Sequence, residues 1–141
     1  MNKEKIKIAF EPIGTCQVES FRNLIKDLYK ESDCYEISII SNSFDYDYLS
    51  TIKSEIGEDV TISMYTNMDS LIEVLDTKAI DIYLNPTESV RLFVEAMAVT
   101  AVGVLVNEIM DTYLAQPKYI TKLKFWIKYL KEGDSLGKSC E

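Results

Sequence analysis

Short apolar runs alternate along this chain with stretches in which apolar residues recur every three or four positions. The short runs are typical of buried strands, and the recurrence is typical of amphipathic helices. We therefore predict strands at Ile6–Phe10, Tyr35–Ile40, Val60–Met64, Ile80–Leu84 and Val102–Val106. We predict helices at Gln17–Lys30, Tyr46–Ile56, Asp69–Leu75, Glu88–Val99 and Lys118–Lys131.

Strands that alternate with helices build βαβ units, in which helices cover both faces of a parallel sheet. The expected fold class is therefore α/β: a three-layer, doubly wound, Rossmann-like parallel sheet of about five strands. A length of 141 residues indicates one domain. We predict that residues 1–131 form this domain and that residues 132–141, which read EGDSLGKSCE, form a flexible C-terminal tail.

Composition narrows the function classes. The net charge of −8 argues against nucleic-acid binding, because phosphate contacts need clustered Lys and Arg. The chain has no His, which excludes Ser-His-Asp and Cys-His chemistry.

Three cysteines without CxxC spacing indicate a reducing compartment. No apolar run fits a signal peptide or a membrane span. We expect a protein of the cytoplasm or of an assembled particle, not secreted and not bound to membrane.

Polar and turn-forming residues follow three of the predicted strands, where ligands bind in a parallel sheet. The candidate ligand-binding residues there are Gly14, Thr15, Ser41 and Asn42. The residues after the first and fourth predicted strands also have a structural explanation. Thr15 can cap the first helix, and Asn85 can cap the fourth helix, with Pro86 at the first position of that helix.

In order and spacing these motifs resemble the haloacid dehalogenase-like (HAD) superfamily over roughly residues 5–107. The resemblance implies a nucleophile and a general acid in a DxDGT-type motif, a Ser or Thr that binds phosphoryl oxygen, a Lys, and paired acids that hold magnesium. The matching positions here are Glu11, Ile13, Ser41, Lys78 and Asn85. No insertion is long enough for a cap domain, so the chain resembles the capless members.

The departures from the HAD pattern fall on the reacting groups. Glu11 is one methylene longer than the expected Asp, Ile13 cannot donate a proton, and Asn85 stands where magnesium needs a carboxylate. We therefore expect a degenerate, catalytically inactive HAD-like domain without metal or cofactor, working as a structural or protein-interaction component, for example of a bacterial or phage assembly. The alternatives are a diverged magnesium-dependent phosphatase and a phosphate- or nucleotide-binding module without turnover.

The last predicted helix carries five lysines and no acid within an acidic chain. Two aromatic residues fall on its lysine-bearing side. Such a face either contacts a protein, such as an acidic surface of a second subunit, or is a solvated face. On the first interpretation we expect a protein partner or self-association, and the interaction candidates are Lys118, Lys122, Phe125 and Tyr129.

Overall fold

A five-stranded, all-parallel sheet forms the centre of the protein, as seen in a computed structural model that describes residues 5–31 and 33–115. The strand order is β3-β2-β1-β4-β5, and every neighbouring pair is parallel. The strands are β1 (Ile6–Phe10), β2 (Tyr35–Ser41), β3 (Thr61–Met64), β4 (Ile82–Asn85) and β5 (Val102–Leu105). The predicted α/β class and the number of strands are confirmed.

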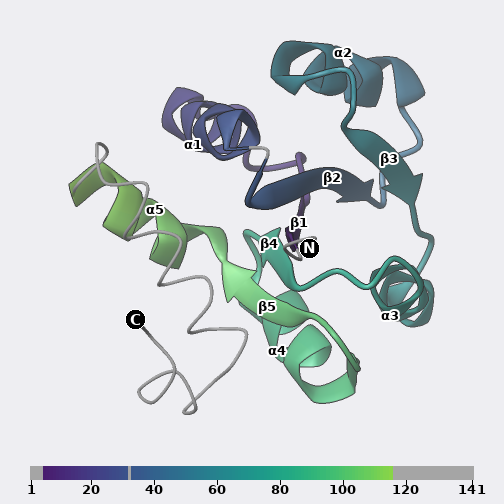
Figure 1. Cartoon of the computed structure of the whole chain (residues 1–141). Coiled ribbons are helices and arrows are strands. Elements are labelled where there is room, and N and C mark those ends of the chain that lie inside the picture. Colours follow the sequence, from purple (N-terminus) through teal and green to yellow (C-terminus); the bar gives the residue numbers. More distant parts are fainter. Residues whose placement is uncertain (1–4, 32, 116–141) are drawn as a thin grey trace.

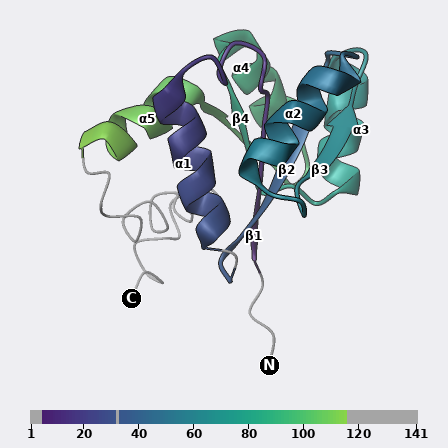
Figure 2. The ribbon, with the colours of Figure 1, turned by 90° about the horizontal axis from the view of Figure 1, so that it is seen from above.

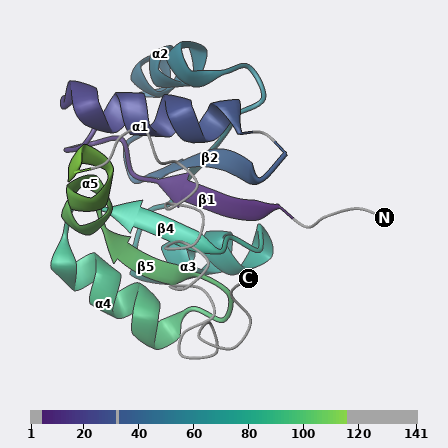
Figure 3. The ribbon, with the colours of Figure 1, turned by 60° about the vertical axis from the view of Figure 1, so that its left-hand side comes forward.

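Helices cover both faces of the sheet (Figure 1). They are α1 (Glu19–Lys30), α2 (Tyr46–Ile56), α3 (Met68–Thr77), α4 (Glu88–Met97) and α5 (Val106–Ala115). The chain runs outward from β1 to β3 and then returns past β1 to β4 and β5. Because parallel crossovers keep one handedness, this reversal puts α1 and α2 on one face and α3 and α4 on the other. In Figure 3, α1 and α2 lie above the strands and α4 lies below them.

Two apolar clusters hold the layers together, one on each face of the sheet. The strands supply them alternately, because successive side chains point to opposite faces. Ile8 and Phe10 of β1 pack under α1, α2 and α5, whereas Ala9 faces α3 and α4. The rings of Phe10 and Phe21 meet edge to face with their centroids 5.6 Å apart. Figure 2 shows α1, α2 and α5 over the first of these faces.

Our prediction for the segment at the end of β5 is wrong. We predicted that Val106 ends a strand, but Val106 begins α5, whose Ile109 and Met110 complete the core beside α1. The apolar run Val102–Val106 gave no sign of the change from strand to helix. The predicted helix Lys118–Lys131, its four interaction candidates and the predicted tail lie outside the described residues.

Two predicted helix caps are wrong. The N-cap residue of α1 is Val18 rather than Thr15, and α4 has Thr87 as its N-cap rather than Asn85. In both cases the polar side chain already bonds to the turn that precedes the helix: Thr15 Oγ1 donates to the Glu11 carbonyl at 2.6 Å, and Asn85 Oδ1 accepts from the Thr87 amide at 2.9 Å. The predicted end of α2 at Gly57 is confirmed.

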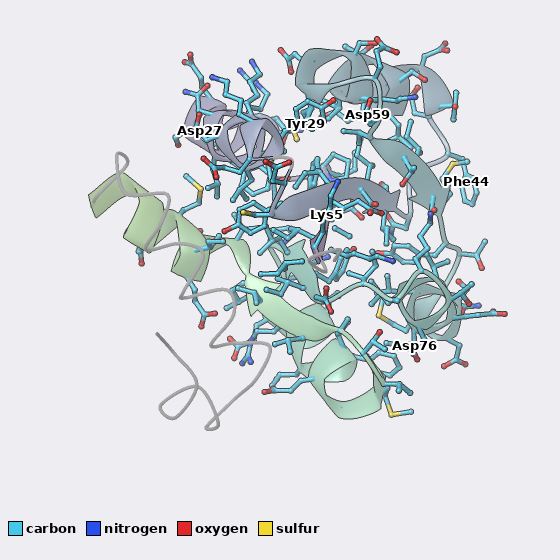
Figure 4. The ribbon with its side chains drawn as sticks, in the orientation of Figure 1. Lys5, Asp27, Tyr29, Phe44, Asp59 and Asp76 are labelled. Atoms are coloured by element: carbon cyan, nitrogen blue, oxygen red, sulfur yellow. The ribbon has the colours of Figure 1, made fainter. Side chains whose placement is uncertain are left out.

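Asp76 links the end of α3 to the loop before β5. It lies near the end of α3, and its Oδ1 accepts from the amides of Val99 and Thr100 at 3.0 and 3.2 Å. The Thr100 hydroxyl donates to the same oxygen at 3.3 Å. The loop that leads into β5 is therefore tied to the end of α3 (Figure 4).

No helix within residues 5–31 and 33–115 is long and apolar enough to cross a membrane.

Gly103 allows α4 to lie directly against β5. A Cβ at this position would be 2.8 Å from the carbonyl oxygen of Arg91, a backbone atom that cannot rotate away. We expect Gly103→Ala to lower the free energy of unfolding by about 1–3 kcal/mol, the usual cost of overpacking. Urea denaturation measures this. Ser89→Ala, on the exposed side of α4, is the control and should change stability by less than about 0.5 kcal/mol.

Candidate functional site

The carboxyl ends of β1, β2 and β4 meet at one edge of the sheet, where the strand order reverses direction around β1. Ligands of open α/β sheets bind in the crevice outside such a reversal. Glu11 follows β1 directly, and its amide donates to the Leu84 carbonyl at 3.0 Å, which extends the β1–β4 pairing by one bond. Only 5% of Glu11 is exposed, so its carboxylate lies inside the edge rather than above it.

Four donors surround the Glu11 carboxylate. Ser41 Oγ donates to Oε2 at 2.7 Å, and the amide of Ile13 donates to the same oxygen at 3.0 Å. The amide of Asn42 donates to Oε1 at 3.4 Å. The hydroxyl of Tyr65, the residue after β3, also bonds to the carboxylate. One side chain from the β1 end therefore connects the loops that follow β1, β2 and β3.

A second layer of buried polar groups lies behind this carboxylate. The hydroxyl of Tyr65 lies close to that of Tyr83. The Tyr83 hydroxyl donates to the Ile40 carbonyl at 3.3 Å and accepts from Asn85 Nδ2 at 3.2 Å. The network thus runs from Glu11 through two tyrosines to Asn85, across β1, β3 and β4. Both the oxygen and the nitrogen of the Asn85 amide are used within the protein.

Burial raises the pKa values of the titratable groups in this network. It raises the pKa of Glu11 above the ordinary 4.5, while the bonds from Ser41, Ile13, Asn42 and Tyr65 oppose that rise. Burial also raises the pKa of Tyr65 and Tyr83, so both hydroxyls stay protonated at neutral pH. Burial of a carboxylate favours its neutral form, and donors favour its charged form. Here the burial is the larger of the two effects.

A separate apolar pocket of about 240 Å³ opens beside the same edge. Gly14 and Thr15 of the β1–α1 turn line it together with Pro86 and the first turn of α5. Gly14 has a φ of +85°, which side-chain-bearing residues rarely adopt. Of the four ligand-binding candidates, Gly14 and Thr15 therefore face this pocket, whereas Ser41 and Asn42 bond to Glu11.

The structure does not bring Lys78 to this edge. Lys78 follows α3 and precedes β4. In a parallel sheet, that position lies at the amino ends of the strands, opposite to Glu11. Asp81, a neighbouring acid, lies at the amino end too, where its Oδ2 accepts from the Lys7 amide at 2.8 Å. Neither side chain is placed to act on a ligand beside Glu11.

The residues at the Glu11 edge do not fit magnesium. Magnesium is bound through carboxylate and other oxygens that are free to coordinate it. The Glu11 oxygens instead accept four hydrogen bonds, and Asn85 Oδ1 accepts one from Thr87. In the described part of the chain, no group of three or more His, Cys, Asp or Glu residues is arranged to hold a metal ion.

Cys16 lies in the same turn, yet it is not an activated thiol. The residue is buried, and burial raises its pKa to about 11. The thiolate, which is the reactive form, is therefore scarce at neutral pH.

Sequence reasoning missed the two tyrosines of the network. Tyr83 lies two residues before Asn85, the position that we matched to the paired acids, and Tyr65 follows β3 as Glu11 follows β1. The position of Tyr65 directly after a strand is a signal that could have been used, because the carboxyl ends of all strands in a parallel sheet reach the same edge. The burial of Tyr83 depends on the packing of α3 and α4, which no local pattern encodes.

No model of a known protein family matches this chain, and no curated protein matches it by sequence.

Removing one donor tests how far the buried carboxylate depends on Ser41. We expect Ser41→Ala to lower the free energy of unfolding at pH 7 by about 1–3 kcal/mol, because a buried carboxyl group loses a hydrogen-bond partner. Urea denaturation measures the change. Ser54→Ala, the same substitution on the exposed side of α2, should have an effect below about 0.5 kcal/mol. Equal effects of the two substitutions would contradict a role for Ser41 in holding Glu11.

The pH dependence of stability has a defined sign. The pKa of Glu11 is higher in the folded than in the unfolded protein, so the folded state binds more protons. Its contribution to stability is complete below about pH 4.5 and is lost as the pH rises through the folded-state pKa. We therefore expect wild type to lose stability relative to Glu11→Gln across this window. Urea denaturation of both proteins between pH 4 and pH 8 measures the difference. A difference that is constant or of opposite sign would contradict the raised pKa.

Proposed function

We propose that this chain is a catalytically inactive, HAD-like α/β domain that acts as a protein-interaction component. One observation carries the proposal: the donors at the ends of β1 and β2 bind the protein's own Glu11 carboxylate. The HAD-like assignment requires Glu11 and Ser41, which the family resemblance matches to the nucleophile and phosphoryl-binding positions, to meet at one edge, and they do. We further propose a location in the cytoplasm or in an assembled particle, for example one of bacterial or phage origin.

The occupied donors argue against both alternatives that involve phosphate. A phosphoryl group at this edge would need the Ser41 hydroxyl and the amides of Ile13 and Asn42. The Glu11 carboxyl group already accepts from all three, at 2.7–3.4 Å. Phosphoryl transfer depends on metal and on positive charge at the reacting group. No side chain described at this edge supplies either.

The pocket beside the β1–α1 turn supports the interaction function. Its walls include the apolar side chains of Val18, Phe21, Val106 and Met110. Val18 is 50% exposed, and Ile13 in the same turn is 40% exposed. Exposed apolar residues around an apolar pocket are typical of protein contacts rather than of sites for charged substrates. We infer that the partner inserts an apolar side chain here.

The absence of catalysis can be tested with an aryl phosphate. We expect wild type with millimolar magnesium to hydrolyse p-nitrophenyl phosphate no faster than Glu11→Ala. The physical reason is that Glu11 is already held by four donors and that no metal-binding group of side chains lies among residues 5–31 and 33–115. Release of p-nitrophenolate measures the rate. Magnesium-dependent hydrolysis that Glu11→Ala abolishes would overturn the proposal in favour of a diverged phosphatase.

The interaction surface can be tested by photocrosslinking in native-source lysate. A photoreactive amino acid at Val18 should crosslink to one protein in fixed stoichiometry, and Val18→Asp in an affinity-tagged chain should lose that protein. The same photoreactive residue at Glu73, exposed on α3, is the control. Mass spectrometry identifies the product. Equal crosslinking from both positions, or none from Val18, would contradict an interaction through this pocket.

A further inference from the structure

The apolar pocket beside the β1–α1 turn has one wall that α5 supplies. This wall consists of Val106, Asn107, Met110 and Asp111, whose spacing puts them on one side of the helix. α5 lies next to α1 (Figure 2), and Val18 at the start of α1 lines the pocket while half of its surface stays exposed. The pocket therefore has apolar surface that a further contact would remove from water.

The sequence that follows α5 carries a second apolar surface. In the predicted helix Lys118–Lys131, which lies outside the described residues, six apolar or aromatic residues recur at helical spacing and so share one side. They are Tyr119, Ile120, Leu123, Trp126, Ile127 and Leu130. Helices with such a side are stabilised mainly by packing it against another apolar surface. The same chain thus carries a pocket with exposed apolar walls and a segment with an apolar side to bury.

The length of the chain allows these two surfaces to meet. α5 ends at Ala115, and its 10 residues span about 15 Å. The residue before a proline is disfavoured in a helix, so Pro117 predicts a turn directly after α5. A helix that begins at Lys118 and runs back along α5 reaches the level of the pocket after about ten residues, at Trp126 and Ile127.

Charge favours the same arrangement. The predicted helix carries five lysines and no acid, whereas Glu108 and Asp111 are exposed on α5. Asp111 is also part of the pocket wall. Complementary charges of this kind contribute to the choice and orientation of a partner more than to its affinity. They therefore favour the lysine-bearing segment over an acidic one as the cover of this pocket.

The size of the pocket suits one large side chain. Its volume of about 240 Å³ is below the roughly 300–1,000 Å³ of sites for drug-sized ligands. Trp126 is the largest residue on the apolar side of the segment, and a buried indole N–H usually finds a hydrogen-bond acceptor. Asn107 and Asp111 bring acceptor oxygens to the pocket wall.

We propose that, in the chain without a partner, the segment Lys118–Lys131 runs back along α5 and places Trp126 in this pocket. The partner inferred above then competes with Trp126 for the same place. This competition rests on the proposed function, whereas the occupation of the pocket does not. Because only molecules with an open pocket bind the partner, the segment weakens partner binding in proportion to the fraction that is covered.

The fluorescence of Trp126, the single tryptophan of the chain, tests the occupation in the purified full chain. We expect Val18→Asp to shift the emission to longer wavelength and to increase quenching by acrylamide, because a charge in the pocket wall expels the indole into water. Val18 is the N-cap residue of α1, where Asp is favoured, so this variant should fold. Leu92→Asp, the same change at a similarly exposed position of α4, should alter neither property.

Two results would overturn the occupation by this segment. One is a wild-type emission and quenching that match those of free indole in water. The other is a response to Val18→Asp that is absent or no larger than the response to Leu92→Asp. Protection of Trp126 that is lost on dilution would show that a second copy supplies the segment, which also contradicts the proposal.

The competition is tested in native-source lysate with the photoreactive residue at Val18. Trp126→Ala empties the pocket and should increase the yield of crosslinked partner, whereas Phe125→Ala, on the other side of the predicted helix, should not increase it. A yield that Trp126→Ala leaves unchanged would contradict the competition. If none of these proteins captures a partner, the proposed function fails, and the fluorescence alone decides whether Trp126 occupies the pocket.

Discussion

The arrangement of the functional edge depends on the need to satisfy one buried carboxylate. Glu11 lies where β1 leaves the sheet, and its carboxyl group bonds to Ile13 in its own turn and to Ser41 and Asn42 at the end of β2. A buried carboxylate without donors is strongly destabilising, so the loops after β1, β2 and β3 must stay close enough to bond to it. The edge that could have held a ligand is thereby organised around a side chain of the protein.

Much of the fold could be predicted from the sequence because its patterns are local. β1 and α2 lie at the bounds that their apolar residues indicate, and Gly57 ends α2 as expected. The failures arise where tertiary contacts compete with local preference. Thr15 and Asn85 are good capping residues, yet both bond within the preceding turn. Val106 reads as strand but begins a helix, because α5 completes the apolar layer against α1.

The candidate site could be located from the sequence, but its state could not. Parallel topology alone places Glu11, Ser41 and Asn85 at one edge, and the structure has them there. Nothing in the pattern indicates that Ser41 bonds to Glu11 at 2.7 Å or that Tyr65 and Tyr83 continue the network. Such pairing depends on distances between loops that are far apart in the sequence. The match of Lys78 to this edge is wrong, because Lys78 follows α3 and therefore lies at the other end of the sheet.

The bond from Asp76 to the loop before β5 bears on how the protein opens. β5 is one of the two edge strands and, within the described residues, pairs with β4 alone, an arrangement that by itself favours fraying of the edge. One carboxylate oxygen on α3 holds both amides of the turn that leads into this strand. Opening of β5 therefore also breaks contacts of α3, on the same face of the sheet. The edge strand and the third helix belong to one cooperative unit, although more than twenty residues separate them.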